Sequence, residues 1–314
     1  TKSRCLRKGY EDWIPGGWAK GVPITVQQCV QCGAAYTSPR LQETFKHLAF
    51  EGAYPFYERA RTDRLQATQA EIEAPFQTRV SDLEALFPEA GYVLDVGMGD
   101  GVFLAMMARR GWRVAGVDVE ADVVAYAQRH WGIQEVQVAD AERDALPQGP
   151  FDAITLWGMF QLAYEPTALL DKLRARLAPN GVLAIGVSNM EGLGSRLFRS
   201  HWRGLGLPRH LVHYTPDRLT RLLESCGFRV ERVTFETPEW ILRPSLQAAL
   251  RLEGWPGRII GKTIAMLWKP LGGSRLGDTF RIFARPEAVA PVPMPSPTST
   301  PTEPNEGDVP PPGA

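Results

Sequence analysis

The chain has 314 residues, of which 44% are hydrophobic, and its 35 basic side chains balance 35 acidic ones. This length and composition provide for a sizeable core and exclude a wholly disordered protein. The zero net charge also argues against a bulk nucleic-acid binder, which carries a large positive excess on the chain or on one face.

The neutral sum hides three differently charged segments. Residues 1–194 hold 19 basic and 24 acidic side chains, residues 195–285 hold 16 and 7, and residues 286–314 hold none and 4. We therefore expect residues 195–285 to favour an anionic substrate or an anionic membrane surface. No apolar run reaches the roughly 20 residues of a membrane-spanning helix and no leader pattern is visible, so we expect a cytoplasmic protein.

Composition sets the two ends of the chain apart. Residues 1–40 are rich in Gly, Pro and aromatic residues without a clear period and predict a small module, and residues 41–88 predict a helical cover. The last 29 residues, 286–314, contain 10 of the 26 prolines and almost nothing bulky. Such a segment cannot bury enough surface to offset its chain entropy, so we predict a disordered tail.

Between these ends, short β-branched runs alternate with amphipathic stretches, the pattern of a mostly parallel sheet flanked by helices. The predicted strands are Tyr92–Val96, Trp112–Asp118, Ile133–Val138, Phe151–Trp157, Val182–Val187, Phe228–Phe235 and Thr279–Ala284. The predicted helices are Val102–Arg110, Ala121–Trp131 and Pro166–Leu177, with a fourth that begins after Thr215 and ends at Gly227. Thr215 is expected to cap that helix, and Asn180-Gly181 to turn into the fifth strand.

A glycine-rich loop follows the first of these strands. Gly97, Gly99 and Gly101 alternate between an apolar strand and a helix start, where glycine lets the backbone approach a ligand closely. A dinucleotide fingerprint would need a further glycine where Val102 stands, which disfavours an NAD-dependent oxidoreductase. Asp95, two residues before the first glycine, instead favours a cationic ligand.

A second carboxylate ends the next strand. Asp118 stands where α/β nucleotide sites place an acid that accepts both ribose hydroxyls. With Asp140-Ala141, Phe151-Asp152, Leu177-Ala-Pro-Asn-Gly181 and Gly227-Phe228, these motifs make residues 89–235 resemble the class I S-adenosylmethionine-dependent methyltransferases. The resemblance implies a Rossmann-like α/β domain over residues 89–285, with a seven-stranded, mostly parallel sheet whose last strand is antiparallel.

The same resemblance implies where S-adenosylmethionine would bind. The three glycines would pass under its amino-acid part, Asp95 and Asp100 would lie near its ammonium or sulfonium end, and Asp118 would hold the ribose with Val119 beside it. The expected contacts around the adenine are Asp140, Ala141 and Trp157.

Three of the four cysteines stand near the start of the chain. Cys5, Cys29 and Cys32 resemble part of the zinc-ribbon extension of one group of these methyltransferases, which has two Cys-x-x-Cys knuckles. Lys8 stands where the fourth cysteine would be, and an ammonium group is not a zinc ligand. Three hypotheses stay open, in this order: a degenerate ribbon held by packing, a three-cysteine zinc site, and a redox pair.

The loops after the fourth and fifth strands are expected to reach over the cofactor. Many relatives carry Glu-His, associated with a metal in quinone-pathway O-methyltransferases, where this chain has Gln161 and Leu162. Residues 208–215 resemble a Pro-Arg-His-x-x-x-Phe/Tyr segment of the same group. The candidates for contacting substrate or acting as base are His210, His213 and Tyr214, with loop packing as the alternative role.

Residues 237–277 combine tryptophans, such as Trp240, Trp255 and Trp268, with basic and apolar residues. The combination resembles an interfacial helix, although packing against the sheet edge explains the same apolar residues. Under the membrane hypothesis the protein is peripheral and its acceptor is a lipid or an isoprenoid-linked headgroup.

Together these patterns predict an S-adenosylmethionine-dependent methyltransferase that acts on O, N or C of a small-molecule or lipid-linked acceptor. The absence of Glu-His and of one ribbon cysteine leaves a catalytically inactive, methyltransferase-like binding protein as the alternative. A nucleic-acid methyltransferase is disfavoured, because the chain has no Asn/Asp-Pro-Pro-Tyr motif and no paired-cysteine mechanism motif.

Overall fold

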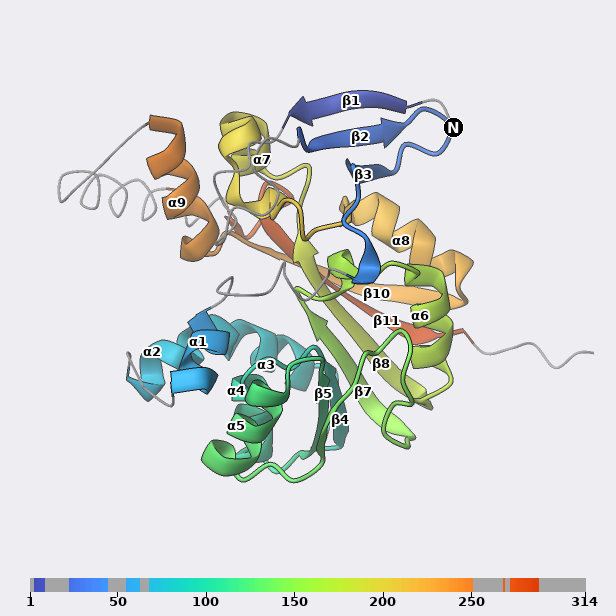
Figure 1. Ribbon diagram of the computed structural model, residues 1–314. Helices are drawn as coiled ribbons and strands as arrows, with labels where there is room; N and C mark the ends of the chain where they lie inside the picture. The colour runs from blue at the N-terminus through green and yellow to red at the C-terminus, as the bar shows by residue number, and fades with distance from the viewer. Residues whose placement is uncertain are drawn as a thin grey trace, which may run out of the picture.

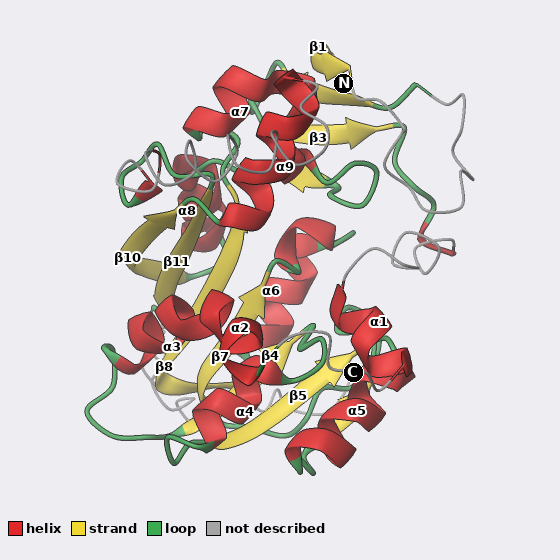
Figure 2. Cartoon of the chain, turned by 90° about the vertical axis from the view of Figure 1, so that its left-hand side faces the viewer, coloured by secondary structure: helices red, strands yellow, loops and turns green. Residues whose placement is uncertain are grey.

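The structure is a computed structural model that describes residues 3–8, 23–44, 55–62, 68–250, 268 and 272–287. The predicted tail from residue 288 onward lies outside these residues, as does most of the predicted insertion after residue 250. A large twisted sheet carries helices on both faces, and a smaller sheet lies beyond one end of it (Figures 1 and 2).

The large sheet has seven strands in the order β10-β11-β8-β7-β4-β5-β6. Their bounds are β4 Tyr92–Val96, β5 Arg113–Asp118, β6 Val136–Val138, β7 Phe151–Trp157, β8 Leu177–Ser188, β10 Phe228–Glu236 and β11 Thr279–Pro286. β11 runs antiparallel to both of its neighbours, whereas the pairs from β8 to β6 are parallel. The predicted fold class is therefore confirmed, including the antiparallel last strand.

Helices cover both faces of this sheet (Figure 1). One face carries α3 (Gln77–Glu84), α4 (Val102–Ala108) and α5 (Ala121–Trp131), and the other carries α6 (Pro166–Arg174) and α8 (Pro216–Ser225). Successive strand residues enter opposite cores: Val93 packs with the α3–α4 face and Leu94 with the α6–α8 face. This layering gathers the carboxyl ends of β4, β5 and β7 at one edge, where α/β folds bind ligands.

Most predicted boundaries are close to the observed ones, and β4, β7 and α5 match residue for residue. The main difference is β8, which begins at Leu177 and includes Asn180 and Gly181, where a turn was predicted. Leu177 pairs with Phe151 across the sheet before the register shifts, and this pairing draws the segment into the strand. The predicted turn is thus an irregularity inside a strand.

The N-terminal module forms a second, four-stranded sheet. Its strands are β1 (Ser3–Lys8), β2 (Thr25–Cys29), β3 (Ala35–Ser38) and β9 (Val212–His213), in that order. β9 belongs to the long connection after β8 and pairs antiparallel with β3. The Thr37 hydroxyl also donates to the His210 carbonyl oxygen at 2.5 Å. The module is therefore completed by a strand of the large domain.

The helical cover begins with α1 (Pro55–Thr62) and α2 (Gln69–Glu73), which precede α3. α2 starts with a reciprocal capping box between Thr68 and Glu71, which satisfies two backbone donors that would otherwise lack partners. α1 packs against α5, so the cover lies beside the helix that follows β5.

The described part of the predicted insertion is α9 (Glu239–Leu250). Its residues Ile241, Leu242 and Leu246 pack in a cluster with Val26 and Trp202. α9 contacts α7 (Leu193–Phe198) and the short turns that follow it, in the connection after β8. Within the described ranges, none of the helices has the length and apolar character needed to span a bilayer.

Candidate cofactor site

The loop after β4 takes left-handed backbone angles at all three of its glycines, with φ of 73° at Gly97, 57° at Gly99 and 81° at Gly101. L side chains rarely adopt these angles. The Val117 carbonyl oxygen accepts hydrogen bonds from the backbone of Gly97 at 2.9 Å and of Met98 at 3.1 Å. These bonds hold a tight backbone cradle at the carboxyl edge of the sheet.

Asp118 closes this cradle from the end of β5. The Gly99 N–H donates to Oδ2 at 2.9 Å, and the Glu120 N–H donates to Oδ1 at 3.1 Å. Burial raises the pKa of Asp118 to about 6. Val119, the next residue, is exposed. Each carboxylate oxygen can accept a further hydrogen bond, which matches the two donors of a ribose diol.

Asp95 precedes the three glycines and Asp100 stands between the last two, and both acids are buried. Burial raises the pKa of Asp95 to about 7, although the Thr155 hydroxyl donates to its Oδ1 at 2.6 Å. Asp100 pairs with Arg59 of α1, with 2.7 Å between Nε and Oδ2, yet burial still raises its pKa. A cation bound beside these groups would stabilise their charged forms.

The other expected contacts follow β6 and β7. Ala141 is buried, and Asp140 Oδ1 accepts from the Glu142 N–H at 3.1 Å. Trp157 packs edge-on against Phe103 with 5.5 Å between ring centroids, in the cluster on the α4 face, whereas Ala141 belongs to the cluster on the opposite face. In the described structure the buried Trp157 Nε1 has no hydrogen-bond partner, which leaves a donor for a ligand.

Arg79 of α3 lies at the same edge and was not among the predicted site residues. Its guanidinium carbon lies 4.7 Å from the Phe76 ring centroid and 5.9 Å from that of Trp157. Burial lowers its pKa, while Glu236 and Asp95 oppose that effect. Among the described residues no carboxylate is bonded to this half-buried guanidinium, whose contacts are with the two rings. The sequence signal that could have identified Arg79 is a basic residue within an amphipathic helix.

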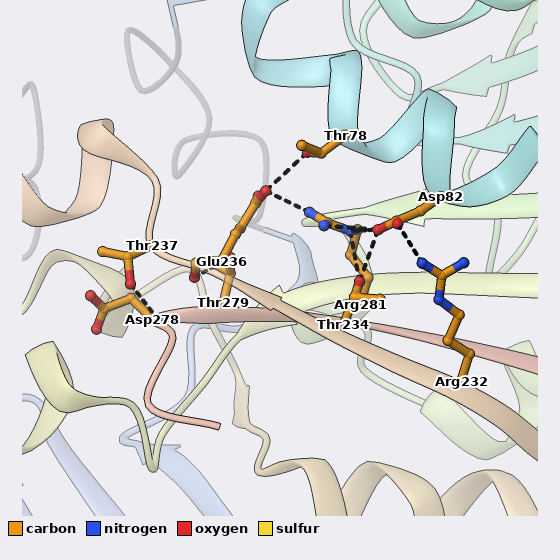
Figure 3. Close-up of polar contacts among 9 residues, drawn as sticks. All are labelled: Thr78, Asp82, Arg232, Thr234, Glu236, Thr237, Asp278, Thr279 and Arg281. Carbon is orange, nitrogen blue, oxygen red and sulfur yellow. Dashed lines mark hydrogen bonds and ion pairs between the residues drawn. The ribbon is translucent and has the colours of Figure 1, made fainter. Parts of the chain in front are cut away.

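Ion pairs fix α3 onto the last two strands (Figure 3). Asp82 accepts from Arg232 of β10 at 2.9 Å and from Arg281 of β11 at 2.9 Å. Arg281 also pairs with Glu236 at 2.6 Å, and the Thr78 hydroxyl donates to the same carboxylate at 3.1 Å. Arg281 is only 6% exposed. The network therefore fixes the position of α3, the helix that carries Arg79.

His210 is buried, and both of its ring nitrogens have protein partners. Nδ1 lies 3.1 Å from the Gly204 carbonyl oxygen, and Nε2 lies 2.9 Å from the Gln161 side-chain nitrogen. Gln161 Oε1 in turn accepts from the Ser188 N–H at 3.0 Å. Burial lowers the pKa of His210 to about 3, so the ring is neutral. Gln161 thus ties the end of β8 to the loop that carries His210.

The other two candidates of this segment are also buried. His213 Nε2 lies 3.0 Å from the Thr37 hydroxyl of the N-terminal sheet. Tyr214 stacks on Phe160 with 5.4 Å between centroids, and burial raises its pKa. Neither of these observations tests catalysis, so the role of His213 and Tyr214 as base or substrate contact stays a prediction.

The structure does not bring Cys5, Cys29 and Cys32 together as a metal site. No group of three or more metal-ligating side chains is found within the described part of the chain. Cys5 pairs with Gln27 across the hairpin, one diagonal away from Cys29. The three-cysteine zinc site therefore finds no support among the described residues and stays a prediction.

A Rossmann-like sheet with a glycine cradle and a carboxylate at the end of the next strand forms a site for a nucleotide cofactor, which agrees with the resemblance to the class I S-adenosylmethionine-dependent methyltransferases. A family profile described as a methyltransferase domain matches residues 68–233, and the chain belongs to this family.

Two curated relatives and one solved structure illustrate the similarity. The chain is 31% identical over 160 residues to a ubiquinone biosynthesis O-methyltransferase of Xanthomonas axonopodis pv. citri, which covers 48% of this chain and 67% of the relative. It is 30% identical over 153 residues to that of Xanthomonas euvesicatoria pv. vesicatoria, covering 45% and 64%. The 1,6-didemethyltoxoflavin-N1-methyltransferase of Burkholderia thailandensis, solved with S-adenosylhomocysteine, superposes with a TM-score of 0.51 at 17% identity over 83% of this chain and 99% of that one. The two sequence matches span about two thirds of the length of the curated relatives. The match to the solved structure shows the fold alone.

Proposed function

We propose that this chain transfers a methyl group from S-adenosylmethionine to a hydroxyl oxygen of a small, isoprenoid-linked acceptor of the kind used in ubiquinone biosynthesis. The observation that carries the proposal is the glycine cradle closed by Asp118. The acceptor class is supported by the relatives named ubiquinone biosynthesis O-methyltransferase.

The residues present fit this cofactor. We assign the ribose to Asp118 and Val119, the adenine to Asp140 and Ala141, and the amino-acid part to the glycine loop. The bound cofactor supplies an electrophilic methyl group on a sulfonium. The cation and carboxylate of its amino-acid part suit Asp95 and Arg79, which bear opposite charges at one edge of the sheet.

This chain's contribution to the reaction is then mainly positioning. The acceptor oxygen has to lie about 3 Å from the methyl carbon and in line with the bond that breaks. The unpaired indole N–H of Trp157 and the cation of Arg79 orient the amino-acid end, and Asp100, paired with Arg59, keeps α1 beside the loop. We assign His210, through Gln161, the role of positioning the loop after β8.

Membrane contact through residues 237–277 is part of the proposal, since an isoprenoid-linked acceptor resides in a bilayer. In the described residues it is supported by α9, where Trp240 is 55% exposed and Leu250 is 54% exposed. Sedimentation with anionic lipid vesicles tests this contact: Trp240→Ala should reduce the bound fraction, and equal binding of both forms would remove α9 from the proposal.

Calorimetric titration with S-adenosylmethionine and S-adenosylhomocysteine tests the cofactor assignment. Asp118→Asn should abolish or strongly weaken binding, whereas Asp217→Asn, an equal charge change at a carboxylate that is 59% exposed on α8, should not. A lipid extract incubated with labelled cofactor, followed by mass spectrometry of the product, identifies the acceptor. Cofactor binding without methyl transfer to any extract component would instead support a binding protein.

A further inference from the structure

A surface cavity of about 650 Å³ lies on the N-terminal sheet, apart from the cofactor loop. Its walls come from β1, from the turn that joins β2 to β3, and from α8 (Figure 1). Arg4, Arg218 and Arg221 line it together with Cys29 and Cys32. The methyltransferase function proposed above uses none of these residues.

The three arginines make this cavity cationic. Arg4 donates to the neutral Gln28 Oε1 through Nε at 2.9 Å and Nη2 at 2.6 Å, and Arg218 donates to the Cys32 carbonyl oxygen. Arg221 is exposed. No carboxylate is present among the described residues that line the cavity. Three positive charges therefore converge on one hollow, which attracts anions.

The two cysteines stand at the floor of the same cavity. Both are free thiols; Cys29 is buried and Cys32 is exposed. A tight turn brings them together: Gly33 has a φ of 71°, and its N–H donates to the Cys29 carbonyl oxygen at 2.9 Å. The Cys32 thiol is thus open to a ligand. The Cys29 thiol stands on the other side of the same turn, where it can attack Cys32 and release a ligand bound there.

We propose that Cys29 and Cys32 form a redox dithiol that reduces a low-molecular-weight disulfide bearing carboxylates, which Arg4, Arg218 and Arg221 bind. The Cys32 thiolate attacks one sulfur of the ligand, the ligand's S–S bond breaks, and one small thiolate leaves. Cys29 then attacks the Cys32 sulfur, the Cys29–Cys32 disulfide forms, and the second small thiolate leaves. The dithiol loses two electrons, the ligand gains them, and the two thiol protons pass through solvent to the leaving thiolates.

This proposal is independent of the methyltransferase function and is tested on the full chain. The probes are oxidised glutathione, which is anionic, and 2-hydroxyethyl disulfide, which is neutral. Intact-mass spectrometry follows the loss of two hydrogens, and peptide mapping without reduction tests that the bond joins Cys29 and Cys32. Cys32→Ser should not react with either probe at this site, and Cys29→Ser should stop at a mixed disulfide that retains one glutathione moiety.

The arginines provide the discriminating variants. In Arg4→Gln/Arg221→Gln the rate with oxidised glutathione should fall about tenfold while the rate with the neutral probe stays unchanged, because only the anion is steered by charge. Arg229→Gln, a surface change on β10, serves as the matched control. The proposal would be overturned if the double variant reacted more slowly with both probes to the same extent, or with neither. It would also be overturned if each purified chain held one tightly bound zinc that blocks oxidation.

Discussion

Arg79 provides the sharpest test of the cofactor site. A guanidinium that binds a carboxylate in a half-buried site contributes about 1.5–3 kcal/mol. Arg79→Gln should therefore weaken binding of S-adenosylhomocysteine roughly 10-fold to 150-fold. The ligand-free protein should lose little stability, because in the described structure this cation contacts only the Phe76 and Trp157 rings, worth about 0.5–1 kcal/mol each, and burial already disfavours its charge.

Calorimetry with two ligands separates this role from a general loss of structure. S-adenosylhomocysteine carries the amino-acid carboxylate, whereas 5′-methylthioadenosine lacks it, so only the first should bind more weakly to Arg79→Gln. Arg110→Gln is the matched control, since Arg110 lies at the C-terminal end of the helix after the glycine loop and pairs with Glu84 at 3.3 Å. Equal weakening of both ligands, or none, would refute the assignment of the carboxylate to Arg79.

Three further predictions concern other parts of the structure. The pKa values of Asp95 and Asp118 are raised to about 7 and about 6, so the folded protein binds more protons than the unfolded chain between about pH 4 and 7. The free energy of unfolding, measured in urea, should therefore fall as the pH rises through that window, while cofactor affinity rises. If the free energy of unfolding of Asp95→Asn/Asp118→Asn changes with pH as steeply as that of the unmodified protein, the two carboxyls do not cause the effect. Asp82→Asn should lower the free energy of unfolding by about 1.5–3 kcal/mol, because the buried Arg281 then keeps Glu236 as its one carboxylate partner among the described residues. Glu73→Gln, at a pair whose arginine is 44% exposed, should cost under about 1 kcal/mol. Equal costs would exclude a special role for the network in Figure 3. His210→Asn should cost about 1–3 kcal/mol of stability and leave the pH profile of kcat unmoved; a shifted profile would make His210 the base instead.

The fold was predictable because its signals are local. Alternating apolar runs define the strands, and the glycines at 97, 99 and 101 occupy positions whose positive φ only glycine adopts readily. Asp118 was predictable for the same reason, since it ends a strand next to that loop. Each of these features depends on residues close to one another in the sequence.

The errors depend on partners far away in the sequence. Leu177 joins a strand because it pairs with Phe151, which no local pattern reveals. Arg79 gains its significance from Trp157 and Asp95, on two separate strands.

The shared strand pairing between β3 and β9 also bears on how the protein is made. Thr37 and His210, whose hydrogen bond joins the two sheets, are 173 residues apart in the chain. At a synthesis rate of about 5–20 residues per second, β3 waits roughly 10–35 s for its partner to leave the ribosome. Throughout that interval β3 presents an open edge to other chains, a recognised hazard for aggregation. Slow, long-range closure of this kind makes the N-terminal hairpin a segment that a chaperone would protect during synthesis.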